Sequence, residues 1–221
     1  MPGRPTGGAL LRQENDTWLV TLAGLAGHQP PIDPPGMMAF AKEFAPEPML
    51  AAMRAGEPLG DVAAYRYPSS QWRRYDKMRR FPAGLLVVGD ALCSFNPVYG
   101  QGMTVAVLEA GALRECLADG DDDLSRRFFR AAAKPIGAAW RMAVAADLAI
   151  PEVSGRRSMA AKLMARYNDC VLKAAESDVT VAEQFLAVSN LVDPPIRLLH
   201  PAVTTRVAIA NVRRPRRPAS R

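Results

Sequence analysis

Residues 85–117 constrain this chain most. Four branched apolar residues are followed there by Gly89-Asp90, a glycine-containing loop and an apolar helical pattern. The unbroken apolar run at residues 85–88 predicts a short strand buried on both faces, as in a parallel sheet. Asp90 would then stand at the carboxyl end of the strand, where open α/β sheets place their ligands. A carboxylate there suits the hydroxyls of a sugar or polyol better than a phosphate, which is itself anionic.

A helix is predicted to begin at about Gly102 and to end near Gly120, because glycine commonly terminates helices. Its buried face is expected to consist of apolar residues at three- and four-residue spacing, namely Met103, Ala106, Ala110, Leu113 and Leu117.

The loop before this helix contains Pro97, Gly100 and Gly102. Glycines let the backbone turn tightly and approach a flat ligand without a Cβ in the way. The free N–H groups at the start of a helix favour negative charge. A ligand that becomes anionic during its reaction is stabilised at such a place, and the reduced flavin ring is one example.

Residues 89–91, Gly-Asp-Ala, and 96–103, Asn-Pro-Val-Tyr-Gly-Gln-Gly-Met, together resemble the second FAD motif of single-component flavoprotein monooxygenases. This is the group similar to p-hydroxybenzoate hydroxylase and squalene epoxidase. In that family the Asp holds the ribityl chain, and the loop and helix start lie against the isoalloxazine ring. Many members have Asn where this chain has Thr104, so the resemblance implies backbone contacts at that position. The cofactor-binding residues that the resemblance implies are Gly89, Asp90, Pro97, Gly100, Gln101, Gly102, Met103 and Thr104.

The resemblance covers only the carboxyl half of the family, from about residue 16 to residue 207. Family members begin with a strand, Gly-x-Gly-x-x-Gly and a helix, which hold the ADP part of FAD. Gly3, Gly7 and Gly8 have the wrong spacing for this fingerprint, and the family's upstream Asp-Gly element is also missing. We therefore expect a missing N-terminal FAD-binding half that is lost, separately encoded or cut off by a misplaced start.

Composition predicts a soluble, cytoplasmic protein with no transmembrane segment. Apolar residues make up 49% of the 221 residues, but no apolar run reaches the length of a membrane span. The three cysteines are odd in number and far apart, which argues against a disulfide framework and for a reducing compartment. For Cys93, within the motif, a redox role and a buried space-filling role are both considered, and the second is favoured.

Other catalytic schemes find little support in the sequence. The two histidines, His28 and His200, have no Gly-x-Ser-x-Gly element to accompany them. The acidic run at residues 121–123 is typical of a helix start, and it lacks the His or Cys partners of a metal site. We predict no metal, and the catalytic residues remain unknown from the sequence.

The net charge of +6 is largely carried by one end of the chain, through Arg213, Arg214, Arg216, Arg217 and Arg221. Pro215 and Pro218 favour an extended backbone there. Because no aromatic residue is interleaved with these arginines, nucleic-acid binding is not predicted.

The expected fold class is α/β, a mixed α+β fragment that forms the carboxyl half of a flavoprotein monooxygenase fold. Four parts are expected: the end of a substrate-binding domain (1–80), a flavin-binding strand-loop-helix (81–120), a helical C-terminal region (121–207) and a basic disordered tail (208–221). Alternation predicts strands at 17–23, in an antiparallel sheet, and at 61–67. Helices are predicted at 37–44, 47–54, 123–133, 136–149, 156–173 and 179–191.

Residues 69–80 are expected to lead from the substrate domain back to the flavin domain. Trp72, Arg73 or Tyr75 could line the substrate pocket, because an aromatic ring beside a cation suits a planar or anionic ligand. The favoured alternative is a surface crossover with solvated arginines and a packed Trp72.

The function that the resemblance implies is an FAD-binding, NAD(P)H-dependent monooxygenase acting on a small apolar or aromatic substrate, inactive if the chain stands alone. A flavin-dependent reductase or dehydrogenase of the same superfamily is one alternative. A non-catalytic remnant is the other. Purified alone, the chain is expected to be colourless.

Overall fold

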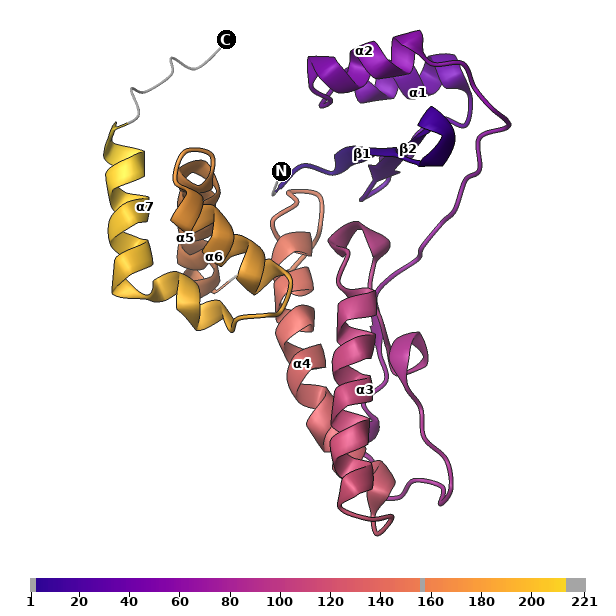
Figure 1. Ribbon diagram of the computed structural model, residues 1–221, viewed down its shortest axis with the longest axis vertical. Coiled ribbons are helices and arrows are strands. Elements are labelled where there is room, and N and C mark those ends of the chain that lie inside the picture. The colour runs from indigo at the N-terminus through magenta and orange to yellow at the C-terminus, as the bar shows by residue number, and fades with distance from the viewer. Residues whose placement is uncertain (1–2, 156–157, 214–221) are drawn as a thin grey trace. The chain divides into compact units, whose positions relative to one another are not determined.

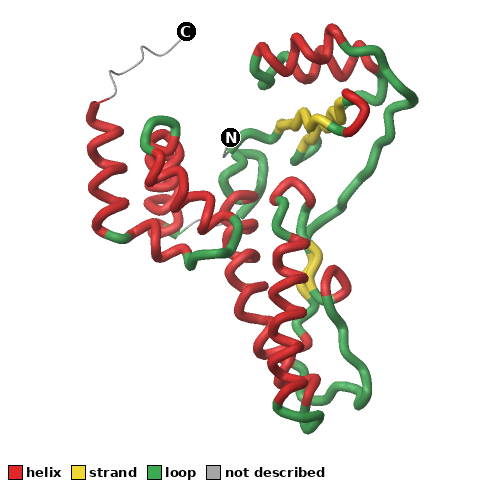
Figure 2. The backbone as a smooth tube through the Cα atoms, viewed as in Figure 1, coloured by secondary structure: helices red, strands yellow, loops and turns green. Residues whose placement is uncertain are grey.

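The computed structural model describes residues 3–155 and 158–213. They divide into two compact units. The first comprises residues 3–68 and 146–155, and the second comprises residues 69–145 and 158–213. The described part of the chain holds seven α-helices and two small antiparallel sheets of two strands each, so the fold mixes helix and strand (Figures 1 and 2).

The first unit contains a β-hairpin of β1 (Thr6–Arg12) and β2 (Trp18–Gly24). The prediction of a strand at 17–23 is confirmed, as is its antiparallel pairing. The partner strand β1, which contains Gly7 and Gly8, was not predicted. Asn15 and Asp16, in the connecting turn, have positive φ values of 58° and 57°, which Asn and Asp tolerate better than most residues.

Two short helices follow, α1 (Pro34–Ala41) and α2 (Glu47–Ala55), close to the predicted ranges. Asp33 caps α1, since its Oδ1 accepts the Gly36 N–H over 2.8 Å. Prolines occupy the first turn of each helix, where a missing N–H costs nothing. Ala41, Met49 and Leu50 are buried in this unit.

The strand predicted at 61–67 is wrong. Residues 61–70 contain no helix or strand and form a coil in Figure 2. Tyr65 is exposed, as is Leu59 just before the segment. Alternation alone does not create a strand, which also needs a neighbouring strand to complete its hydrogen bonds.

The second unit is built around α3 (Gly102–Ala118) and α4 (Leu124–Asp147, to residue 145 within this unit), which lie side by side (Figure 1). They share one apolar core with the residues around the short sheet of β3 (Gln71–Trp72) and β4 (Cys93–Ser94). The core includes Leu92, Cys93, Phe95, Val105, Cys116, Phe128, Phe129, Ala132, Ile136, Ala139 and Ala143.

Residues 85–88 do not form the predicted buried strand. Leu86 and Val87 pack against the apolar core, but Leu85 and Val88 are exposed. Val88 has an extended backbone, with φ −132° and ψ 161°. No strand of the described residues pairs with this segment, so it is not part of a sheet.

Helix α3 begins at Gly102 as predicted, and Gly120 follows its end with φ +89°. The predicted buried face is wrong. Met103, Ala110 and Leu117 are exposed, while Ala106 and Leu113 are half-buried. Val105, Glu109 and Cys116 face the core instead. The core contacts this neighbouring face of the helix. Leu113 still packs against the core, but Met103, Ala110 and Leu117 are left outside it.

Helix α4 is continuous where two helices were predicted. Pro135 lies inside it and removes one backbone hydrogen bond. Buried residues on both sides of the proline, among them Phe128, Ala132 and Ile136, hold the helix against the core. Their packing therefore outweighs the local interruption.

Helices α5 (Met159–Ala175), α6 (Val179–Ser189) and α7 (Pro201–Arg213) pack together around a second apolar cluster. Residues 156–157, where α5 was predicted to begin, lie outside the described residues. Helix α7 was not predicted. It extends through residues 208–213, so this part of the predicted disordered tail is wrong, and residues 214–221 lie outside the described residues. None of the described helices is long and apolar enough to cross a membrane.

Candidate functional site

The Gly89-Asp90 corner forms a short 3-10 turn over Gly89–Ala91, immediately before β4. Gly89 has φ +61°, a left-handed conformation that glycine adopts without strain. The turn leaves Asp90 exposed, next to the start of α3. A Cβ placed on Gly102 would lie 3.8 Å from Oδ1 of Asp90. The carboxylate and the first residue of the helix are therefore neighbours in space, although twelve positions separate them in sequence.

The loop between β4 and α3 makes a second 3-10 turn over Pro97–Tyr99. The side chain of Asn96 caps it, because its Oδ1 accepts the Val98 N–H over 3.1 Å. Gly100 ends the turn with φ +66°, and no described atom lies within 4 Å of the place where its Cβ would be. The backbone at Gly100 thus borders open space.

The N-cap residue of α3 makes no side-chain capping hydrogen bond. Gln101 occupies the N-cap position, but its side chain is buried and points elsewhere. Its Nε2 donates to the Ser189 carbonyl over 3.1 Å and lies 3.9 Å from the Met142 sulfur, while its Oε1 is buried without a partner. The N–H groups of the first turn are left to other acceptors, and a helix amino terminus attracts negative charge.

Of the remaining predicted site residues, Met103 is 83% exposed, Pro97 is exposed and Thr104 is half-buried. Asp90, Gly100 and Met103 are therefore accessible, and Gly102 is half-buried. Gln101 differs, because it serves as a buried link between α3 and the end of α6.

Glu109 was missed by the sequence analysis. It is only 1% exposed, and its Oε2 accepts the Gly89 N–H over 2.6 Å. Its Oε1 is buried without a partner among the described residues. Burial raises the pKa of Glu109; the Gly89 N–H opposes this shift and the charge of Asp90 adds to it. The sequence did contain a signal for its burial. Glu109 lies four residues after Val105 and seven before Cys116, so all three fall on the same face of α3.

Cys93 lies directly beside this corner and is 2% exposed. Burial raises its pKa to about 12, and the charges of Glu109 and Asp90 act in the same direction. The nucleophilic form of cysteine is the thiolate, which such an environment suppresses. The structure therefore favours the space-filling role of Cys93 over the redox role.

The residues proposed for a substrate pocket are used in packing. Trp72 packs against the core, with its ring 5.8 Å from that of Trp140, and Tyr75 stacks on Phe81 and Phe129. The guanidinium of Arg74 lies 3.9 Å above the Trp72 ring and pairs with Asp76. Arg73 is exposed and its Nη1 donates to the Ala91 carbonyl over 3.3 Å. The surface-crossover interpretation fits these contacts.

No cluster of three or more histidine, cysteine or acidic side chains that could hold a metal ion occurs in the described residues. His28 lies 3.7 Å from Glu152 in the first unit. His200 directly precedes α7 in the second.

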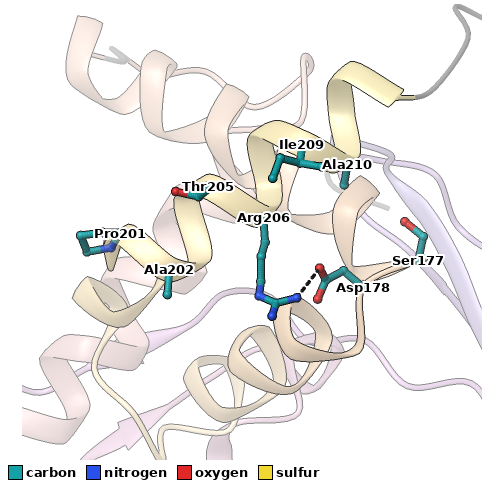
Figure 3. A pocket seen from close by; sticks show the side chains of 8 residues that line it. All are labelled: Ser177, Asp178, Pro201, Ala202, Thr205, Arg206, Ile209 and Ala210. Atoms are coloured by element: carbon teal, nitrogen blue, oxygen red, sulfur yellow. Dashed lines mark hydrogen bonds and ion pairs between the residues drawn. The ribbon is translucent and has the colours of Figure 1, made fainter.

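A separate groove of about 950 Å³ lies between the start of α6 and helix α7 (Figure 3). Arg206 points toward Asp178 across it and forms an ion pair of 3.1 Å. Burial raises the pKa of Asp178, but hydrogen bonds from Arg206 and the Val181 N–H outweigh it, and the pKa lies below its ordinary value. Asp178 also caps α6, so this pair is accounted for by its part in holding α6 to α7.

No protein-family model matches the sequence. A curated relative, Protein Rv3254 of Mycobacterium tuberculosis, is 38% identical over 194 residues, which is 83% of this chain. The match covers 40% of that relative, so the chain spans about two fifths of its length. The chain thus has a longer relative.

Proposed function

We propose that the surface formed by Asp90, Gly100, Gly102 and Met103 is the flavin-contacting part of an FAD site. The observation that supports this most is the proximity of the Asp90 carboxylate to the start of α3, with 3.8 Å between Oδ1 and the Cβ position of Gly102. An acceptor for hydroxyl groups then lies beside free N–H donors. These are the two chemistries that a ribityl chain and a ring that becomes anionic call for.

The residues present fit this part of the cofactor. Asp90 is exposed and can accept from ribityl hydroxyls, Gly100 leaves open space above its backbone, and the N-cap residue of α3, Gln101, makes no side-chain capping bond. The sequence offers no comparable place for the ADP part, because the Gly-x-Gly-x-x-Gly fingerprint is absent. The proposal therefore includes a missing N-terminal FAD-binding half.

The activity proposed is that of an FAD-dependent oxidoreductase, an NAD(P)H-dependent monooxygenase that hydroxylates or epoxidises a small apolar or aromatic molecule. When bound, the flavin supplies the redox chemistry with NAD(P)H and dioxygen. The residues of this chain would orient the ribityl chain through Asp90 and stabilise negative charge on the ring through the N–H groups of α3. This half supplies no catalytic acid or base in the proposal, and Cys93 remains a protonated thiol. The three cysteines of this chain are free, as is usual in a reducing compartment, and this supports the proposed cytoplasmic location.

A flavin titration of the purified chain tests the site. Riboflavin, FMN and FAD are expected to bind weakly and with similar affinity, because only the ribityl and ring contacts are supplied here. Asp90→Ala should weaken binding by about tenfold, the equivalent of about 1.4 kcal/mol for lost hydrogen bonds to a charged group. Asp121→Ala removes an exposed acid beyond the other end of α3 and serves as the matched control. Equal binding by the two variants and the parent chain would remove the basis of the proposal.

Co-expression with a polypeptide that carries the ADP-binding fingerprint tests the activity. A yellow complex that consumes NAD(P)H and dioxygen and oxygenates its substrate is expected. Flavin reduction and substrate reduction without oxygen uptake would instead identify the reductase alternative.

A further inference from the structure

We propose that residues 85–88 and one face of α3 form a docking surface for a polypeptide that adds a β-strand to residues 85–88. The occupant is the counterpart of the part of Rv3254 that lies outside its match to this chain. This inference deepens the proposed function and rests on it in one respect, because that function also requires a second half. It names where the second half binds and by which interaction.

The first observation is an apolar face of α3 that nothing described covers, here called the exposed stripe and made of Met103, Val107, Ala110 and Leu117. These residues recur at four-, three- and seven-residue spacing and therefore lie on one side of the helix. Met103 is 83% exposed, Val107 71% and Leu117 49%. Contiguous apolar surface of this kind marks interaction sites in soluble proteins. Arg114 shares this face, and its long stem lets the guanidinium reach the rim of an interface.

The second observation is an unpaired backbone edge at residues 85–88. Among the described residues, no backbone hydrogen bond is made by Leu86, Val87 or Val88. The segment is nevertheless fixed, because Leu86 and Val87 pack on the apolar core and Ser125 Oγ donates to the Leu85 carbonyl over 3.0 Å. Val88, at the end of the segment, is extended, with φ −132° and ψ 161°. A backbone edge that is held in place and has free N–H and C=O groups is a template for an added strand.

The two surfaces are continuous. Gly89, which follows the free edge, is bonded to Glu109 in the middle of α3. A Cβ on Gly89 would lie 4.0 Å from the Cβ of Ala106. Ala106 is flanked on the same side of the helix by Met103 and Ala110, at three- and four-residue spacing. One partner can therefore pair with the edge and cover Val107, Ala110 and Leu117 together, while Met103 remains at the flavin-contacting surface.

A polypeptide fits this surface better than a small molecule. The free edge requires main-chain donors and acceptors in a row, which a strand supplies. Rv3254 has polypeptide available for this role, because 40% of its length matches this chain and the remainder lies outside the match. A strand added at residues 85–88 would also give this apolar run the sheet that its sequence pattern predicts.

The experiment mixes the full chain, without flavin, with the segment of Rv3254 outside the match and measures association by pull-down and light scattering. Val107→Glu and Leu117→Glu should each weaken association by at least about tenfold, because a charge would be buried in the interface. Leu163→Glu is the matched control, since Leu163 is 70% exposed on α5, and it should leave association unchanged. Amide exchange at residues 86–88 should slow by at least about tenfold in the complex.

Four outcomes would overturn the inference: no association with this segment, association insensitive to Val107→Glu and Leu117→Glu, slow amide exchange at residues 86–88 in the chain alone, or self-association abolished by the same two variants. Asp90→Asn should leave association intact. If the parent chain binds no flavin, or binds it equally well after Asp90→Ala, while association is preserved, the proposed function fails and the docking surface stands.

Discussion

The Gly89 N–H donates a hydrogen bond of 2.6 Å to Oε2 of Glu109, twenty residues further along the chain. Through this bond a buried side chain of α3 holds the turn that carries Asp90. The position of the exposed carboxylate therefore depends on a carboxyl group inside the core. Because Glu109 is buried and its pKa is raised, its protonation state affects the same turn.

Replacing Glu109 should separate its hydrogen bond from its charge. Glu109→Gln keeps an acceptor for the Gly89 N–H, so its free energy of unfolding is expected to lie within about 1 kcal/mol of that of the parent chain. Glu109→Leu removes the acceptor and should lower the free energy of unfolding by about 1–3 kcal/mol. Urea denaturation followed by the fluorescence of Trp72 and Trp140, both packed on this core, measures the difference. Glu115→Leu, at an exposed position of the same helix, is the control and should have little effect.

The raised pKa of Glu109 predicts how stability depends on pH. A carboxyl whose pKa is higher in the folded than in the unfolded state stabilises the fold while protonated. This contribution is complete below the ordinary value of 4.5 and is lost as the pH rises through the folded pKa. The free energy of unfolding, compared with Glu109→Gln over a pH series, should therefore fall by at most about 1.4 kcal/mol per pH unit. A difference that stays constant from acidic to neutral pH would contradict the assignment.

Cysteine reactivity should follow burial. Cys93 and Cys116 are buried, and the pKa of Cys93 is raised to about 12, whereas Cys170 is half-buried. Iodoacetamide at neutral pH is expected to alkylate Cys170 first and to reach Cys93 only as the protein unfolds. Peptide mass mapping over time measures the order, and labelling in urea, where all three should react, is the control. Rapid native alkylation of Cys93 would show that the corner is open.

Gln101 should tolerate an apolar replacement better than an acidic one. Its Nε2 donates to the Ser189 carbonyl, and its Oε1 has no partner among the described residues. Gln101→Met loses one hydrogen bond and is expected to destabilise by about 1 kcal/mol. Gln101→Glu places a buried acceptor against a carbonyl and should cost about 2–4 kcal/mol, more than the roughly 1 kcal/mol gained near the α3 amino terminus. Thermal and urea unfolding of the two variants give the order, and the reverse order would refute this account of the side chain.

Local signals were sufficient for many elements. Strand β2, helices α1 and α2, and the start of α3 at Gly102 agree with the predictions. Asp33 and Asp178 cap helices where the predicted elements begin to within a few residues. Such signals act within one turn of the chain, so they are readable without knowledge of distant residues.

Helix α7 shows where local signals were overlooked. Val203, Val207 and Ala210 follow a helical spacing after Pro201, and they pack on the second cluster. A disordered tail was predicted from residue 208 onward because the residues that follow are basic. Tertiary contacts, such as the hydrogen bond of 2.9 Å from Asn211 Nδ2 to the Cys170 carbonyl, help hold the helix in place.

By itself, the sequence determined that a Gly-Asp corner precedes a helix at Gly102, because glycine conformations and apolar periodicity are properties of short segments. Only the tertiary structure decided which face of α3 is buried, that Glu109 holds Gly89, and that residues 85–88 are left without a sheet. Burial and strand pairing depend on which other segments are present to cover a surface. A helix with apolar residues on two sides cannot specify that choice alone.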